Sequence, residues 1–196
     1  MTKTKRSSAT YQIKVTLRDI RPPIWRRIQV RSDITLGTLH KIIQIIMGWT
    51  DTHLHQFTVG ETYYGVPDPI ATYEIKNEKN VKLSRIVSGE GTKFVYEYDF
   101  GDYWCHEILI EKILPFDPVK KSPICLRGKR ATPPEDVGGA WGYKDFLEAI
   151  FDADHPEHED MLDWIGGAFD PEEFDLDKIN QKLENIESYR SVFYWN

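Results

Sequence analysis

Imidazole and carboxylate side chains that could share a metal ion occur in two short stretches of the sequence. His53 and His55 are two positions apart, so a β-strand at this point would direct both imidazoles to one face of its sheet. Asp99, Asp102 and His106 lie in a second stretch, which could form the neighbouring hairpin. Such side chains suit zinc and other divalent metals, so these residues form a candidate metal site. The alternative is that the histidines form hydrogen bonds within the sheet.

A candidate binding loop lies between residues 133 and 143. It combines carboxylates, adjacent glycines that let a ligand approach the backbone, and aromatic rings. Its candidate residues are Glu135, Asp136, Gly138, Gly139, Trp141 and Tyr143. Trp104 and Arg26 join them as candidate ligand-binding residues from two predicted strands. The alternatives are a structural turn whose acids cap the next helix, and a structural ion pair between Arg26 and a carboxylate of the central hairpin.

Complete catalytic motifs are absent from the sequence. Asp99-Phe100-Gly101 has the letters of the kinase triplet, but the glycine-rich loop, strand lysine and catalytic loop of a kinase are missing. No phosphate-binding loop or dinucleotide fingerprint occurs, and His106 has no second histidine at the spacing of a zincin. The catalytic residues therefore stay unknown, and whether the protein is an enzyme stays open.

The segment 94–114 contains the hairpin that would position many of these groups. Aromatic and branched residues alternate with polar ones from Phe94 to Phe100 and again after Trp104, which is the period of half-buried strands. Asp99 to Asp102 supplies the turn between them. The same alternation predicts strands at 11–17, 24–30 and 53–59.

Helical spacing of apolar residues predicts a helix from Thr35 to Met47, with Thr35 as its cap and Gly48 as its left-handed stop. From about residue 141 onward the chain is predicted to be helical, with a cap and first-turn proline at Asp170-Pro171. The segment 115–134, with its five prolines, is predicted to be irregular. The segment 76–80 is predicted to be exposed.

Together these elements predict an α+β fold. We expect a β-grasp-like mixed or antiparallel sheet of about five or six strands, crossed by one helix and covered in part by additional C-terminal helices. At 40% hydrophobic and 13% aromatic residues, the 196-residue chain can bury a core. The expected organisation is a flexible basic tail at 1–10, a single domain at 11–187 and an aromatic C-terminal tail at 188–196.

Composition limits the cellular compartments in which the protein is expected. No apolar run approaches the roughly 18 residues of a membrane span, and no apolar segment follows the basic N-terminus, so we expect neither a membrane protein nor a signal peptide. Two cysteines do not make a disulfide framework, which indicates a reduced, cytoplasmic protein. The net charge of −6 combines a basic start with an acidic segment at 135–177. One interpretation is that the basic segment forms an end of the molecule that faces a nucleic acid. The alternative is that the basic and acidic segments face each other or are simply solvated.

Several segments resemble the plasmid pRiA4b open-reading-frame-three-like family, in order, from about Tyr11 to Leu183. The matching residues are Pro23–Arg27, Leu36–Trp49, His53–Phe57, Tyr96–Asp102, Trp104, His106, Cys125, Gly128, Pro133–Gly139, Gly142, Tyr143 and Phe169–Asp175. The resemblance implies a link to mobile DNA, because some relatives travel on plasmids or as insertion-sequence passengers with a resolvase-like label. It implies no catalysis here, since the chain lacks a recognisable serine-recombinase domain.

Two functions follow as hypotheses. The first is a non-catalytic binding or interaction module, associated with mobile DNA, whose partner is a protein, a peptide or a nucleic acid. The second is a metal-dependent enzyme, hydrolytic for example, that uses the histidine and carboxylate cluster with a divalent metal as cofactor. The oligomeric state does not follow from the sequence.

Overall fold

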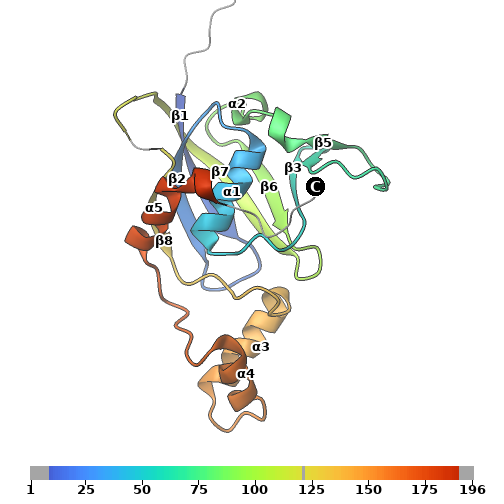
Figure 1. The fold of residues 1–196 in the computed structure, drawn as a ribbon, viewed down its shortest axis with the longest axis vertical. Helices are drawn as coiled ribbons and strands as arrows, with labels where there is room; N and C mark the ends of the chain where they lie inside the picture. Colours follow the sequence, from blue (N-terminus) through green and yellow to red (C-terminus); the bar gives the residue numbers. More distant parts are fainter. Residues whose placement is uncertain (1–8, 121, 190–196) are drawn as a thin grey trace, which may run out of the picture.

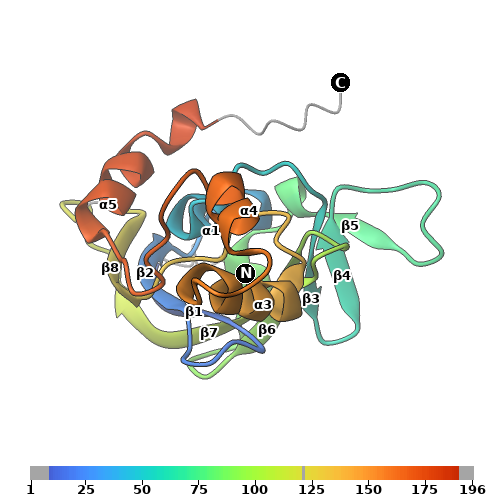
Figure 2. The ribbon, with the colours of Figure 1, turned by 90° about the horizontal axis from the view of Figure 1, so that it is seen from below.

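An eight-stranded sheet forms the body of the protein in the computed structural model, which describes residues 9–120 and 122–189. The strands run in the order β5-β4-β3-β6-β7-β1-β2-β8, and neighbours are antiparallel except for β4 and β5, which are parallel. Their bounds are β1 Ala9–Leu17, β2 Trp25–Arg31, β3 His55–Val59, β4 Thr62–Gly65, β5 Ile75–Asn77, β6 Lys93–Tyr98, β7 Trp104–Pro115 and β8 Ile124–Lys129. Figure 2 shows β8 at one end of the sheet and β4 and β5 at the other.

The central pair, β6 and β7, forms as the alternation predicts. Tyr96 pairs with His106 and Tyr98 with Trp104, and all four of these side chains are buried. The intervening residues, such as Glu97 and Glu107, are only partly buried because they lie on the other face. Period-two alternation therefore places a layer of rings on one face of the sheet.

One helix, α1 (Leu36–Met47), lies across this ring-bearing face (Figure 1). Thr35 caps its first turn by accepting a hydrogen bond from the Thr38 amide, and Gly48 ends it at φ 85°. Its apolar residues are almost completely buried against the sheet; they include Leu36, Leu39, Ile42, Ile43 and Ile46. The predicted helix, its cap and its stop are confirmed.

The other helices of the described residues are α3, which is one residue longer than α1, and several shorter ones. They are η1 Glu78–Asn80, α2 Leu83–Ile86, α3 Gly139–Phe151, α4 His158–Ile165, α5 Leu176–Glu184 and η2 Ile186–Ser188. α3 and α4 pack together below the sheet in Figure 1, around Phe146, which contacts the rings of Trp164 and Phe169. α5 packs against β8 and α1. None of the helices in residues 9–120 and 122–189 has the length and apolar character needed to cross a membrane.

The α+β class and the single crossing helix are thus confirmed, while three details differ from the sequence prediction. The sheet has eight strands rather than five or six. The segment 115–134 is not wholly irregular, because β8 forms within it and pairs with β2. Glu78 is buried at 3% exposure, although the segment 76–80 was predicted to be exposed. The β-grasp-like description stays a prediction.

Two predicted boundaries also change. β1 begins at Ala9, so the last two residues of the predicted tail at 1–10 belong to the sheet. The turn at Asp170-Pro171 does not open a helix; α5 begins at Leu176, and Asp175 caps it by accepting from the Lys178 amide. The rest of the predicted basic tail and the aromatic residues 190–196 lie outside the described residues.

Arg26 joins β2 to α1 and β8 inside the protein. Its guanidinium donates to the carbonyls of Ile46, Trp25 and Lys129 and to the Thr132 hydroxyl, at 2.9 to 3.0 Å. No carboxylate pairs with it among the described residues, so the predicted ion pair is wrong. Burial lowers the pKa of Arg26 to about 10. The charge is tolerated because backbone dipoles and the face of Phe174, 4.9 Å away, replace water.

We expect Arg26→Lys to destabilise the protein by about 3 kcal/mol, since a single ammonium cannot reach four acceptors that a planar guanidinium satisfies together. Denaturant unfolding monitored by circular dichroism measures the change. Arg21→Lys, at an exposed position, is the matched control and is expected to leave stability unchanged. A loss below about 1 kcal/mol for Arg26→Lys would show that the buried bonds are not needed.

Candidate functional site

A layer of aromatic and imidazole rings fills the space between α1 and the middle of the sheet. Trp49 stacks on Tyr98 with ring centres 5.0 Å apart and meets the edge of His106 at 5.3 Å. The other three histidines near this layer are His40 from α1, His55 from β3 and His53 from the loop before β3. They form two groups with carboxylates, one closed and one open.

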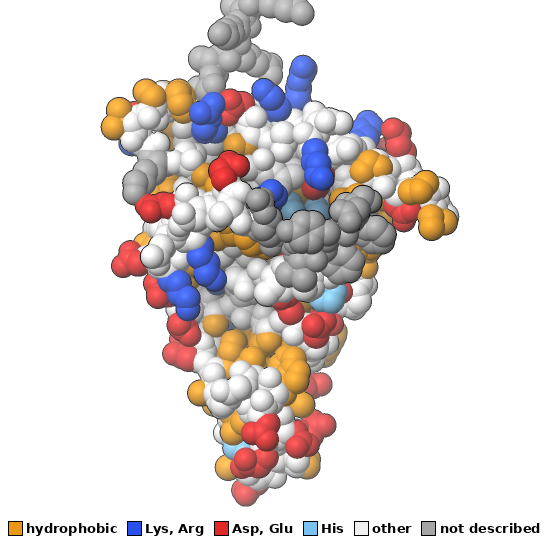
Figure 3. All heavy atoms as spheres, viewed as in Figure 1, with side chains coloured by type: hydrophobic (Ala, Val, Ile, Leu, Met, Phe, Trp, Pro, Cys, Tyr) orange, Lys and Arg blue, Asp and Glu red, His pale blue; other side chains and the backbone are white. Residues whose placement is uncertain are grey.

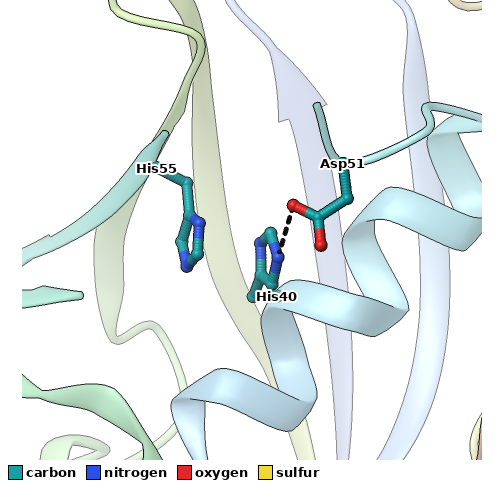
Figure 4. Close-up of side chains that lie close together, drawn as sticks. All are labelled: His40, Asp51 and His55. Carbon is teal, nitrogen blue, oxygen red and sulfur yellow. Dashed lines mark ion pairs between the residues drawn. The ribbon is translucent and has the colours of Figure 1, made fainter. Parts of the chain in front are cut away.

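The closed group is centred on His40 and His55, whose rings stack in parallel with centres 3.5 Å apart and planes 5° from one another (Figure 4). Nε2 of His40 lies 3.0 Å from Asp51 Oδ1, and Nε2 of His55 lies 2.9 Å from Glu78 Oε2. Nδ1 of His40 lies 2.8 Å from the Tyr96 hydroxyl. Each imidazole therefore has its own carboxylate, and the group is almost completely buried.

Burial and charge set the protonation of this closed group. Burial, together with the neighbouring His55, lowers the pKa of His40 despite the opposing effect of Asp51. Burial alone would raise the pKa of Glu78, but its hydrogen bond and electrostatic interaction with His55 hold it below the usual value. Burial raises the pKa of Tyr96 well above 10, so its hydroxyl stays protonated. The group thus favours a charged Glu78 and a neutral His40.

The closed group is poorly arranged for a metal, although one ligand atom from each of His40, Asp51 and His55 lies within 4.8 Å of the others. The lone pairs of an imidazole lie in the plane of its ring. Two rings stacked in parallel at 3.5 Å direct their lone pairs side by side rather than toward one ion. We therefore interpret this group as a hydrogen-bonded connection between α1, β3 and η1.

The open group consists of His53, Asp99 and Asp136. Nε2 of His53 lies 3.1 Å from Asp136 Oδ1 and 3.6 Å from Asp99 Oδ2. The side chain of Asp99 is 9% exposed, that of His53 28% and that of Asp136 69%, so the group opens to solvent on the Asp136 side. In the described chain, this His53 nitrogen is buried and has no hydrogen-bond partner.

Each member of the open group is held by its neighbours. Oδ1 of Asp99 accepts hydrogen bonds from the amides of Gly101 and Asp102 in the β6–β7 turn, which leaves Oδ2 facing His53. The His53 ring meets the Tyr98 ring edge-on at 5.8 Å. Asp136 has φ 62°, a left-handed conformation that sets the direction of its side chain. The three groups are therefore positioned before any ligand arrives.

The predicted metal ligands thus separate. His53 and Asp99 come together, His55 belongs to the closed group, and Asp102 accepts a hydrogen bond from the Gly138 amide instead. His106 is completely buried, and its Nδ1 lies 3.0 Å from the Trp104 carbonyl. Burial lowers the pKa of His106 to about 4, so it is neutral at physiological pH. The structure does not assemble all five residues around one point.

The predicted binding-loop residues also separate, into core and surface. Trp104 and Tyr143 are buried at 1% and 2% exposure, and burial raises the pKa of Tyr143 to about 12. Glu135 accepts hydrogen bonds from the Thr50 amide and hydroxyl and from the Tyr98 hydroxyl. As described above, Arg26 is also in the interior.

Gly138 and Gly139 form a close joint with the β6–β7 turn. Both have positive φ, 92° and 69°, and a Cβ on Gly139 would collide with the Asp102 carbonyl. Their close approach is therefore to the protein's own backbone, whereas the acids of the loop do not cap α3, which has no side-chain cap. Asp136 and Trp141 remain open to solvent, and Trp141 is 78% exposed.

Four members of the two groups were not among the metal ligands predicted from the sequence. Asp136 was assigned to the binding loop, and neither Asp51 nor Glu78 was singled out. His40 was also missed, although it had a signal: His40 and Gln44 are polar residues four apart on an otherwise apolar helix face. Their shared partner, the Tyr96 hydroxyl, lies over fifty residues away in the sequence.

The fold and these groups define an α+β protein with a helix-covered sheet and histidine–carboxylate clusters at its centre and edge. The chain belongs to the plasmid pRiA4b ORF-3-like protein family, whose model matches residues 9–178.

Two relatives share most of the chain. The uncharacterized protein y4hQ of Sinorhizobium fredii (strain NBRC 101917 / NGR234) is 35% identical over 181 residues, which is 91% of this chain and 93% of the relative. The crystal structure of the protein of unknown function MM3350 from Methanosarcina mazei Go1 superposes with a TM-score of 0.79 at 41% identity, covering 87% of this chain and 97% of the other. Neither name states an activity, so function must be argued from the site.

We expect Gly139→Ala to destabilise the protein by about 2 kcal/mol or more, because it combines a left-handed backbone with a steric collision. Thermal or denaturant unfolding measures the loss. Gly89→Ala is the control, since a Cβ at Gly89 meets nothing within 4 Å and its φ is not in the left-handed region. Equal stability of the two variants would contradict the joint described here.

The low pKa of His106 predicts acid sensitivity. Between pH 6.5 and about 4, an unfolded chain binds a proton at this imidazole while the folded protein does not, so stability falls as the pH decreases. Between pH 7.5 and 5, His106→Phe is expected to lose about 2 kcal/mol less stability than the wild type.

Urea unfolding at several pH values measures this difference. His155→Gln, in the α3–α4 connection, serves as the matched control and should retain the wild-type pH dependence. The same slope in His106→Phe and in the wild type would show that His106 is not responsible.

Proposed function

We propose that this protein is a non-catalytic interaction module that binds a polypeptide through a surface beside Trp141. The observation that carries the proposal is the 78% exposure of Trp141 in the first turn of α3. Tryptophan is enriched among the residues that dominate binding energies at protein interfaces. Its large ring contributes apolar area at little cost in conformational entropy.

Other exposed apolar side chains come from segments that meet at the same junction. Leu54, Phe100 and Tyr103 are 46%, 49% and 59% exposed. The amide of Asp99 donates to the Leu54 carbonyl, which joins the loop before β3 to the β6–β7 turn. The Gly138 joint with Asp102 then brings the start of α3 to the same turn. We call Leu54, Phe100, Tyr103 and Trp141 the aromatic surface.

The charge around α3 and α4 suggests the chemistry of the partner. Acidic residues outnumber basic ones along these helices, where Lys144 is paired with Glu148. The acids from α3 to the end of α4 are Asp145, Glu148, Asp152, Asp154, Glu157, Glu159, Asp160 and Asp163. Figure 3 shows acidic side chains around the lower tip of the molecule, below a group of hydrophobic ones. This combination favours a polypeptide that carries both basic and apolar side chains.

The same charge disfavours a nucleic acid as the partner at this surface, since phosphates would meet carboxylates rather than lysine or arginine. A protein or peptide is therefore the partner we propose. The proposed association with mobile DNA rests on the word plasmid in the family's description. If the association holds, the partner is a protein that a mobile DNA element encodes or uses. A cytoplasmic setting is supported by the free thiols of Cys105 and Cys125.

A metal-dependent enzyme is the second candidate. What favours it is the open group, in which His53 lies within 4 Å of two carboxylates. Against it, no complete sequence motif identifies a nucleophile or a general base. The binding module is preferred because it requires no reacting group.

The test is selection of peptides from a random displayed library on the wild-type protein, followed by calorimetric titration of the enriched peptides. Enriched sequences are expected to combine arginine or lysine with aromatic or aliphatic residues. Trp141→Ala should weaken their binding about tenfold or more, because a central aromatic contact contributes about 2 kcal/mol or more. Circular dichroism checks that the variant is folded.

Ile70→Ala is the matched control. Ile70 is 87% exposed but lies in the loop before β5, so its truncation removes an exposed apolar side chain elsewhere on the molecule. Peptides that bind the wild type, Trp141→Ala and Ile70→Ala equally well, or the absence of any enrichment, would overturn the proposed function.

A further inference from the structure

We infer that His53, Asp99 and Asp136 form a binding site for a divalent transition-metal ion. The site goes beyond the proposed interaction module and does not depend on it. It differs from the ligand set expected from the sequence, because His55, Asp102 and His106 take no part and Asp136 comes from the loop before α3.

The spacing of the ligand atoms fits one ion. Ligand atoms about 2.1 Å from a metal, at tetrahedral or octahedral angles, lie about 3.0 to 3.4 Å from one another. The His53 nitrogen lies 3.1 and 3.6 Å from its two carboxylate oxygens, and the ligand atoms of all three residues lie within 4.8 Å of one another. Both distances from the His53 nitrogen are therefore within a few tenths of an ångström of the spacing that one shared ion requires.

The missing hydrogen bond at His53 is the second observation. Its Nε2 is buried and close to Asp136, yet no hydrogen bond joins them within the described residues. A hydrogen-bonded carboxylate oxygen would lie along the N–H direction. An oxygen that shares an ion with the imidazole lies to the side of that axis, because the ion itself occupies it. A metal thus accounts for both the short distance and the missing hydrogen bond.

The surroundings support ligands rather than a surface ion pair. The turn amides of Gly101 and Asp102 fix one oxygen of Asp99 and direct the other toward His53. Adjacent Glu135, bonded to Thr50 and Tyr98, fixes the loop that carries Asp136. Metal sites commonly have ligands oriented in this way by a second layer of hydrogen bonds.

The donor set and the exposure indicate the kind of ion. One imidazole and two carboxylates suit zinc, manganese, iron or cobalt, whereas a thiolate-seeking ion would need cysteine. Asp136 is 69% exposed, so the protein supplies ligands from the inner side and leaves the outer side open. Water or an anionic oxygen of a ligand would complete the coordination there.

The test uses the full chain, freed of metal by a chelator and then dialysed. Zinc, manganese and cobalt are titrated separately by calorimetry, and cobalt is also followed by its visible absorption. We expect one ion per chain. His53→Ala and Asp136→Ala should each weaken binding about tenfold or more. Asp99→Asn retains a carbonyl oxygen to accept the turn amides, and it should weaken binding similarly without unfolding the hairpin.

Asp145→Asn, at an exposed carboxylate on α3, is the matched control and should bind like the wild type. Absence of saturable binding at millimolar metal would overturn the inference. So would binding that survives both His53→Ala and Asp136→Ala, or that is lost only in His55→Ala, which would assign the ion to the closed group. Peptide binding by these variants is a separate measurement, so failure of the metal site leaves the interaction module untouched.

Discussion

The position of α1 over the sheet depends on the hydrogen bonds made by the Tyr96 hydroxyl. Nδ1 of His40 lies 2.8 Å from it, and Nε2 of Gln44 donates to it at 2.9 Å. All three side chains are buried, and the rest of the helix face is apolar. Apolar packing alone would tolerate sliding of the helix, whereas an unpaired buried hydroxyl, imidazole or amide costs about 1 to 3 kcal/mol. The polar contacts therefore fix where the helix lies.

That fixed helix also positions segments far from it in sequence. His40 stacks on His55 and so holds the start of β3, while His55 in turn holds Glu78 and η1. Trp49, just beyond the end of the helix, donates its ring N–H to the Pro133 carbonyl and so holds the loop that leads to α3. The closed group thus has a structural role, because it connects α1, β3 and η1. The open group lies at the margin of the same framework. There the His53 nitrogen is held close to two carboxylates but forms no hydrogen bond within the described residues.

Local periodicity made most of the fold predictable, because β6, β7 and α1 each bury one regular face. It failed for β8, in which Gly128 interrupts the pattern and prolines flank the segment. That glycine is required by tertiary contacts: a Cβ there would collide with Phe174 and Arg26. The burial of Glu78 was equally invisible, since it follows from pairing with His55. For the candidate site, the sequence predicted that His53 and Asp99 lie close together. It could not show that Asp136, from the loop before α3, lies beside them.

Glu135 and Asp136 show how neighbouring acids acquire different roles. Glu135 points inward, where the Tyr98 hydroxyl and Thr50 use its oxygens, and burial and this carboxylate both raise the pKa of Tyr98. Asp136, turned by its left-handed backbone, points to solvent beside His53. The inward acid anchors the loop, and the anchored loop presents the outward acid and, five residues on, Trp141. The open group and the aromatic surface therefore share one support, the anchored backbone segment from Glu135 to Trp141.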